Sequence, residues 1–286
     1  MPLYAAVDIG SNTIRMDVAE VTAGSAPRVL STDRNVARLG ESVFLTGSIS
    51  PEAMDRAFSI LKRLSALRMP ATRAVGTAAL REAANRAEFV ERASDALGLP
   101  VEIISGDEEA RLIQLGVRSH MPGLCDKPLI VDVGGGSSEI IFGNRIWSLP
   151  LGALRLQSLF IRHDPPLPEE LSALSGFIAE KAAPAISELS AVSVEQVIGT
   201  SATARAVASG ASATAAKVRQ FCKTISSLDL ARRQLISGIG PQRAEIIVPG
   251  AFVLLHVLEA LGLPGLVYCP AALCAGIIAD LAASGT

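Results

Sequence analysis

One short pattern occurs twice in this chain. The segments AAVDIGSNTI (5–14) and LIVDVGGGSS (129–138) each place an apolar run before an Asp, one apolar residue after it, and then Gly followed by small hydroxyl residues. In both, β-prone residues resume after the turn, so each is interpreted as a strand, a Gly-containing turn and a second strand. Asp8 and Asp132 lie about 124 residues apart. The repeat predicts two similar domains, each opening with a phosphate-type turn.

The size and charge of the chain fit such a pair of domains. Its 286 residues are 49% hydrophobic and 19% charged, which is typical of a globular protein and excludes a disordered or fibrous one. The net charge of −2 supplies no overall attraction to nucleic acid or to anionic lipid. A polyanionic ligand must therefore be bound locally.

Cellular location is inferred from the cysteines and the apolar segments. Four cysteines are scattered without metal-site spacing, which predicts buried thiols in a reducing compartment: Cys125, Cys222, Cys269 and Cys274. The N-terminus lacks a basic region and Asp8 interrupts its apolar stretch, so we expect a cytoplasmic protein without a signal peptide. Residues 260–279 carry no charge, yet their Pro and Gly residues favour a helix end, a short strand and a buried helix over a membrane span.

The hydrophobic pattern predicts alternating strands and helices. Ser50 and Pro51 begin a helix that is expected to run to about Arg68, and Asn85 is expected to cap a helix that ends before Gly98. We expect domains over 1–122 and 123–286, with the last helix free to pack back on the first domain. Further strands are predicted at 72–77, 101–105, 128–133, 139–143, 145–150 and 266–269, and further helices at 107–117 and 169–189, with a strand, turn and helix over 195–208.

The two turns are candidate phosphate-binding sites. Gly accepts conformations closed to other residues, so a turn rich in Gly and Ser can direct several backbone N–H groups at one anion. The candidate phosphate contacts are Gly10, Ser11, Asn12 and Thr13 in the first turn and Gly134, Gly135, Gly136 and Ser137 in the second. Asp8, Asp132 and Glu139 are candidate ligands of a divalent cation. Neither turn matches the P-loop or the dinucleotide-binding motif.

Hydrolysis of a bound phosphate chain also needs a base. The segment SGDEEARL (105–112) supplies Glu108 and Glu109, which point about 100° apart if the segment is helical, so only one of them can face a site. The pattern does not choose between them. Arg81 follows a strand and a Gly-Thr turn, where a guanidinium can clamp phosphoryl oxygens.

These segments together resemble the exopolyphosphatase and guanosine pentaphosphate phosphatase (Ppx/GppA) family, in the superfamily of actin-like ATPases. The resemblance rests above all on SGDEEARL and DVGGGSSE, and it is supported by AVGTAALREAANRAEFV, LPLGALRL and VIGTSATARA. It implies an α/β fold of two ribonuclease H-like domains with an interdomain cleft. It further implies Glu109 as the catalytic glutamate, Arg81 as the family arginine, and Mg²⁺ with Asp132 and Glu139 as its ligands and Asp8 third.

The resemblance implies hydrolysis of a terminal phosphoanhydride bond. We expect an exopolyphosphatase that acts on inorganic polyphosphate. The alternatives are a guanosine pentaphosphate phosphohydrolase and a non-catalytic sensor of polyphosphate or nucleotide. The sensor is kept because CPAALCAG (269–276) replaces a family motif similar to S-x-x-G-L-R-E-G, with Cys274 and Ala275 in place of its arginine and glutamate. We expect no nucleic acid or membrane partner, and the apolar C-terminal third is compatible with a homodimer.

Overall fold

A computed structural model describes residues 2–22 and 26–285 and divides the chain into two units. Unit 1 comprises Met1–Pro122 and Ala271–Thr286, and unit 2 comprises Gly123–Pro270. The chain thus leaves unit 1 once and returns to it, so the second unit ends at Pro270 and the last helix belongs to the first unit. No helix among the described residues is long and apolar enough to span a membrane.

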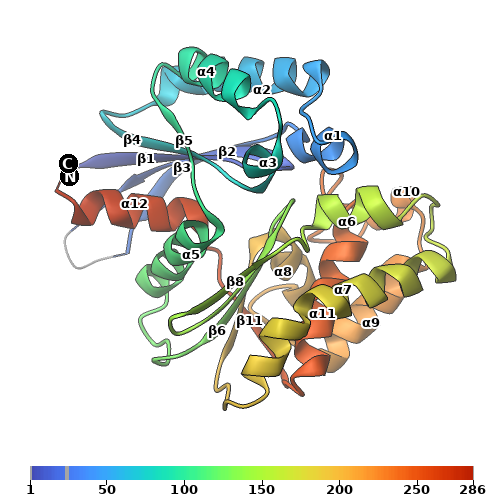
Figure 1. The fold of residues 1–286 in the computed structure, drawn as a ribbon. Helices are drawn as coiled ribbons and strands as arrows, with labels where there is room; N and C mark the ends of the chain where they lie inside the picture. Colours follow the sequence, from blue (N-terminus) through green and yellow to red (C-terminus); the bar gives the residue numbers. More distant parts are fainter. Residues whose placement is uncertain (1, 23–25, 286) are drawn as a thin grey trace. The chain divides into compact units, whose positions relative to one another are not determined.

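Unit 1 contains a five-stranded sheet in the order β3-β2-β1-β4-β5. Strand β1 is antiparallel to β2 and parallel to β4. Helices α2 and α4 cover one face of the sheet, and α5 and α12 cover the other (Figure 1). The strands are β1 (Leu3–Ile9), β2 (Thr13–Glu20), β3 (Arg28–Val36), β4 (Ala71–Gly76) and β5 (Val101–Ile103); the helices are α1 (Leu39–Thr46), α2 (Pro51–Leu64), the 3-10 turn Ser65–Leu67, α3 (Ala78–Glu82), α4 (Arg86–Leu97), α5 (Gly106–His120) and α12 (Leu273–Ala283).

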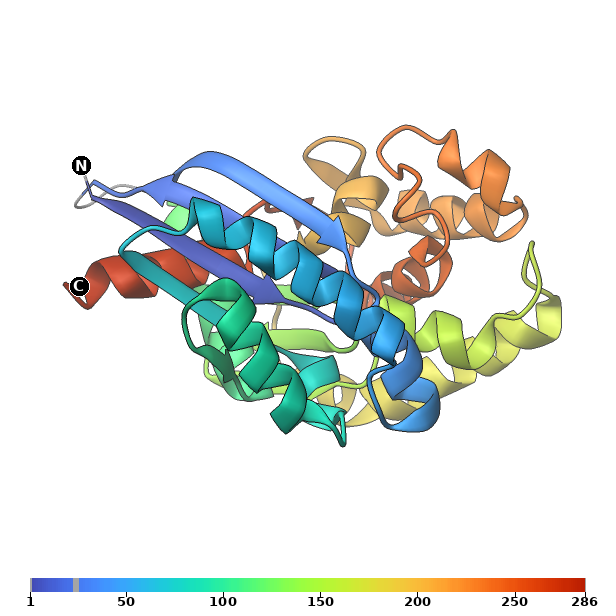
Figure 2. The same ribbon diagram turned by 90° about the horizontal axis from the view of Figure 1, so that it is seen from above.

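The faces of these elements explain why unit 1 folds this way. Strand β1 is an almost wholly buried run, as expected for a central strand covered on both faces. Helix α2 lies along the sheet (Figure 2) and buries an apolar stripe that includes Leu61 and Leu64. Its N-cap is Ser50, whose side chain accepts a hydrogen bond from Ala53 N, with Pro51 in the first turn. The helix ends at Leu64, four residues before the predicted end, because its last turn tightens into 3-10 geometry.

One predicted cap is wrong. Asn85 does precede α4, but its side chain makes no capping hydrogen bond. The side-chain amide instead donates from Nδ2 to Ile49 O at 2.9 Å and accepts from Ile49 N at 3.0 Å. The Asn85 side chain therefore makes a tertiary contact with Ile49 and does not form the cap of α4 that the local pattern predicts.

Unit 2 repeats the strand order of unit 1 around its own core, with β10 as an additional strand at one edge. Its sheet runs β10-β11-β9-β6-β7-β8; β6 is antiparallel to β7 and parallel to β9, as β1 is to β2 and β4. Helices α7, α9 and α11 gather on one side of it (Figure 1). The strands are β6 (Leu129–Val133), β7 (Ser138–Phe142), β8 (Arg145–Leu149), β9 (Val197–Thr200), β10 (Ser212–Thr214) and β11 (Gly265–Tyr268); the helices are α6 (Ala153–Phe160), α7 (Pro168–Leu189), α8 (Ser201–Ala208), α9 (Ala215–Ser226), α10 (Leu230–Gln234) and α11 (Ile247–Ala260).

Candidate active site

The two predicted turns have the same local structure. In the first, Gly10 N donates to Thr13 O at 3.0 Å, and in the second Gly134 N donates to Ser137 O at 3.0 Å. Asp8 lies opposite Arg15 in the first hairpin, and Asp132 lies opposite Glu139 in the second. Equivalent strands thus carry equivalent turns, and the repeat seen in the sequence is a repeat of structure.

The second turn presents its N–H groups on one side. Gly134 O accepts a hydrogen bond from Ala153 N at 2.9 Å, and Gly135 O accepts from Leu154 N at 2.9 Å and Arg155 N at 3.1 Å. These donors are the otherwise unpaired N–H groups of the first turn of α6. In a trans peptide unit the C=O and the N–H point in opposite directions. The N–H groups of Gly135 and Gly136 therefore point away from α6, as an anion-binding turn requires.

Two residues of the LPLGALRL segment hold this turn against α6. A Cβ at Gly152 would lie 2.3 Å from the Gly136 backbone, so only glycine permits this approach. Arg155 is 9% exposed and donates from Nε to Gly136 O at 2.7 Å. This bond fixes the peptide unit between Gly136 and Ser137. The N–H of Ser137 therefore points the same way as those of Gly135 and Gly136. Arg155 is not among the site residues that the sequence predicts.

The first turn is held by residues of α1, of α3 and of the connection between β3 and α1. Ser11 O accepts from Gly40 N at 2.8 Å, and Asn12 O accepts from Ala37 N and Arg38 N, both at 3.0 Å. The N–H groups of Asn12 and Thr13 therefore point away from these donors. Ser11 Oγ accepts from Ala79 N at 3.1 Å, which ties the turn to the first residues of α3. Ser11 thus has a structural partner besides its predicted role in binding phosphate.

Glu109 and Arg81 form an ion pair in unit 1. Glu109 lies in the first turn of α5 and is only 7% exposed. Arg81, in α3, donates from Nη1 to Glu109 Oε2 at 2.7 Å and to Ile104 O at 3.1 Å. The second bond anchors the guanidinium to the chain just before α5, so the carboxylate is held in a defined orientation. The contact of Arg81 with phosphate stays a prediction.

Glu108 points elsewhere. Its carboxylate accepts from Arg111 Nε at 2.7 Å and from Arg111 Nη2 at 2.9 Å. These hydrogen bonds are the main cause that lowers the pKa of Glu108. The adjacent glutamates therefore differ in environment: Glu108 is partly exposed in a surface ion pair, and Glu109 is buried beside Arg81.

Asp132 and Glu139 fit the chemistry of a magnesium site. They lie opposite each other in β6 and β7, so both side chains emerge on one face of the sheet. Thr200 Oγ1 donates to Asp132 Oδ1, and Ser148 Oγ donates to Glu139 Oε1 at 2.9 Å, which fixes both carboxylates. No group of three or more His, Cys, Asp or Glu residues in the described ranges is arranged to hold a metal. A pair of carboxylates completed by phosphate and water oxygens is the usual arrangement for Mg²⁺.

Asp8, the third predicted ligand, belongs to unit 1 and has a different setting. Its cross-strand neighbour Arg15 donates from Nε to Asp17 Oδ1 at 2.8 Å. Burial lowers the pKa of Arg15, but Cys274, Asp17 and Asp8 raise it by more. A guanidinium therefore lies near Asp8, and its role as a metal ligand stays a prediction.

Comparison with known proteins places the chain in a family. The model of the Ppx/GppA phosphatase family matches residues 17–284. The chain belongs to this family. It is 30% identical over 296 aligned residues to a curated protein of Photobacterium profundum named guanosine-5'-triphosphate,3'-diphosphate pyrophosphatase, with 98% of this chain covered. The chain spans 59% of the length of that relative.

Solved structures of the family share the fold. An exopolyphosphatase from Cytophaga hutchinsonii is 24% identical, with a TM-score of 0.90 over 99% of this chain and 98% of that one. An exopolyphosphatase-like protein is 26% identical, with a TM-score of 0.88 over 97% of each chain. The fold is therefore the mixed α/β, two-domain, actin-like fold of the Ppx/GppA phosphatases.

Cys274, at which the sequence is expected to depart from the family motif, lies in the core of unit 1. Cys274 is 4% exposed and lies on the buried face of α12. Burial raises the pKa of its thiol well above the usual range, and Asp17 raises it further. Cys274 is therefore a neutral packing residue. All four cysteines are free thiols, and three are buried.

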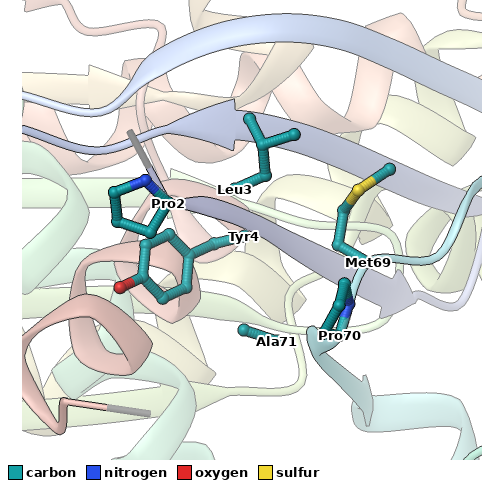
Figure 3. A pocket seen from close by; sticks show the side chains of 6 residues that line it. All are labelled: Pro2, Leu3, Tyr4, Met69, Pro70 and Ala71. Carbon is teal, nitrogen blue, oxygen red and sulfur yellow. The ribbon is translucent and has the colours of Figure 1, made fainter.

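One well-formed pocket in unit 1 is not part of this site. It has a volume of about 510 Å³ and is lined by residues at the start of β1 and of β4 (Figure 3): Pro2, Leu3, Tyr4, Met69, Pro70 and Ala71. Strands β1 and β4 are parallel, so their first residues lie together at one end of the strands, and Asp8 and Gly76 lie near the opposite end. At about 3.3 Å per residue the two ends are roughly 15 Å apart.

Proposed function

We propose that this Ppx/GppA phosphatase is an exopolyphosphatase, which hydrolyses the terminal phosphoanhydride bond of inorganic polyphosphate and releases orthophosphate. The observation that carries the proposal is the buried carboxylate of Glu109, oriented by Arg81 in a unit that also contains an anion-binding turn. The helix dipole favours any carboxylate in the first turn of α5, but Glu109 is in addition buried and held in one orientation by Arg81. Hydrolysis requires a proton acceptor at a bound phosphate chain, and a carboxylate held in this way can serve as one.

In the proposed reaction, a water oxygen attacks the terminal phosphorus and the bond from that phosphorus to the bridging oxygen breaks. Glu109 orients the water and accepts its proton, and the electron pair of the broken bond remains on the bridging oxygen of the shortened chain. The N–H groups of the turns bind phosphoryl oxygens, whose charge they stabilise as the bond breaks. Arg81 contributes the N–H donors that its bonds to Glu109 and Ile104 do not use. A bound Mg²⁺, held by Asp132 and Glu139, would neutralise phosphate charge.

Of the two candidate substrates we favour polyphosphate, because the turns offer anion contacts from small residues. A phosphate chain needs only such contacts, whereas guanosine pentaphosphate also needs room for a purine. The same-length relative named exopolyphosphatase-like supports this choice. The name of the longer curated relative supports guanosine pentaphosphate, which we keep as the second candidate.

The substrate is tested by measuring orthophosphate release from long-chain polyphosphate and from guanosine pentaphosphate, each with and without Mg²⁺, at matched phosphate concentration. We expect a higher kcat/KM on polyphosphate, lost on removal of the metal. Faster release from guanosine pentaphosphate would replace the proposed substrate by the second candidate. Tight polyphosphate binding without any release would identify a sensor instead of an enzyme.

A further inference from the structure

Helices α5 and α12 approach each other through their backbones. A Cβ added at Gly276 of α12 would lie 1.8 Å from Leu112 O of α5. A Cβ added at Gly116 of α5 would lie 2.3 Å from Ala272 O and 2.8 Å from Gly276 N. The two glycines thus make reciprocal contacts, and any side chain at either position would force the helices apart. Figure 1 shows the two helices side by side on one face of the unit 1 sheet.

This contact lies close to the proposed base. Leu112 follows Glu109 by three residues, which is just under one turn of α5. The carbonyl that Gly276 touches therefore belongs to the turn next to Glu109. A displacement of α5 at Leu112 is transmitted to Glu109 because a helix moves as a rigid element over so short a distance.

An ionic network joins the same two helices at the surface. Asp280 of α12 accepts from Arg111 Nη1 at 3.0 Å and from Arg73 Nη1 at 3.3 Å. Arg111 also binds Glu108, the neighbour of Glu109. Asp280 thus connects α12 to the first turns of α5 and to strand β4. These polar contacts hold α12 against α5, as the close approach at Gly116 and Gly276 does.

The other side of α12 faces the strands that carry the first turn. Helix α12 packs on β1, the strand that contains Asp8. Its buried Cys274 lies within electrostatic range of Asp8, Asp17 and Arg15. One helix therefore contacts both the element that carries Glu109 and the strand that leads into the phosphate-binding turn.

We propose that α12 is the positioning element for Glu109, with Gly276 and Asp280 as its positioning residues. The helix sets the place of the carboxylate relative to the first turn, without touching substrate. This inference rests on the proposed function, because it assigns a purpose to the placement of Glu109. It predicts that loosening the contact lowers turnover more than it weakens substrate binding.

The test is Gly276→Ala, measured by orthophosphate release from polyphosphate. The added methyl must move α12 away from α5 by roughly 1 Å, and a misplacement of that size can cost up to ~10²-fold in rate. We expect kcat to fall at least ~10-fold, with KM within ~3-fold of the wild-type value. The matched control is Gly176→Ala in α7, an exposed helical position where an added Cβ meets nothing within 4 Å.

A double variant separates positioning from general damage. In a Glu109→Gln background there is no carboxylate to misplace, so Gly276→Ala should have little further effect on the residual rate. An equal loss in both backgrounds, or an unchanged kcat in the single variant, would overturn the inference. Asp280→Asn, which adds no steric clash, should show the same dependence on Glu109 with a smaller loss of ~2- to 5-fold. This variant decides the outcome if Gly276→Ala does not fold.

The two proposals fail in different ways. If wild-type protein releases no phosphate, or if Glu109→Gln is as active as wild type, the proposed function fails and the inference fails with it. If Glu109→Gln is inactive while Gly276→Ala and Asp280→Asn retain full kcat, the proposed function stands and only the positioning role of α12 is wrong.

Discussion

Replacing Arg155 by Met should weaken substrate binding by releasing the second turn. Arg155 Nε donates to Gly136 O at 2.7 Å, and the side chain is 9% exposed, so the bond is a charge-assisted hydrogen bond in a largely dry setting. Such a bond contributes about 1.5–3 kcal/mol. Met keeps most of the apolar length of the side chain but cannot hold the carbonyl. Since 1.4 kcal/mol corresponds to a tenfold change, the turn should bind phosphate roughly 10- to 100-fold more weakly.

The assay is the KM for polyphosphate from initial rates of orthophosphate release, together with the thermal unfolding midpoint. We expect KM to rise ~10- to 100-fold and kcat to change less, because Glu109 and Arg81 belong to the other unit. The midpoint should fall by about 4–10 °C. Arg205→Met is the matched control, because Arg205 is an exposed arginine on α8. A KM within twofold of wild type would refute the role assigned to Arg155.

Three further predictions concern stability and reactivity. Ser50→Ala removes the cap of α2 and should lower the free energy of unfolding by about 1 kcal/mol in urea titrations; an unchanged value would show that the cap is replaced by water. The pKa of Glu108 is lowered in the folded state, chiefly by its hydrogen bonds to Arg111, so its contribution is present above its ordinary pKa of about 4.5 and is lost as pH falls through the lowered value. Glu108→Gln should therefore destabilise at pH 7 by an amount that shrinks as the pH falls below about 4.5, and a difference that persists undiminished in acid would contradict this. Burial raises the pKa of Cys222 to about 12 and that of Cys274 well above its usual range, so neither thiol should react with iodoacetamide before unfolding, as mass spectrometry can check.

Much of the fold follows from local patterns, and the exceptions have identifiable causes. The central strands are apolar runs with clear turns between them, so β1, β4 and β6 were predictable. Strand β3 was not assigned because most of its residues are exposed, so its sequence has no alternation of buried and exposed positions. It is a strand because β2 pairs with it, which only the tertiary structure shows. Helix α1 was also missed, since Arg38 enters it with a left-handed φ of 55° and no capping side chain.

The candidate site was predictable only in its repeated parts. The two aspartates and glycine turns recur in the sequence, whereas the residues that support them come from distant segments. Arg155 is a single arginine in an apolar helix, and Ser148 is a single hydroxyl on β8, so neither carries a local signal. Thr200 does have a signal in the sequence, because Gly199-Thr200 repeats Gly76-Thr77 at nearly the spacing of the two aspartates. The local pattern does not choose between Glu108 and Glu109, and the choice of Glu109 comes from the family resemblance. The structure adds that Glu109 is the carboxylate that Arg81 contacts.

The most direct measurement of the central claim compares wild-type protein with Glu109→Gln in orthophosphate release from long-chain polyphosphate with Mg²⁺, while polyphosphate binding is measured in parallel by calorimetry. The buried carboxylate is proposed to accept the proton of the attacking water, so the amide should lower kcat at least ~10²-fold and leave the dissociation constant within a few fold. A variant that binds polyphosphate and releases phosphate at the wild-type rate would contradict the proposed mechanism.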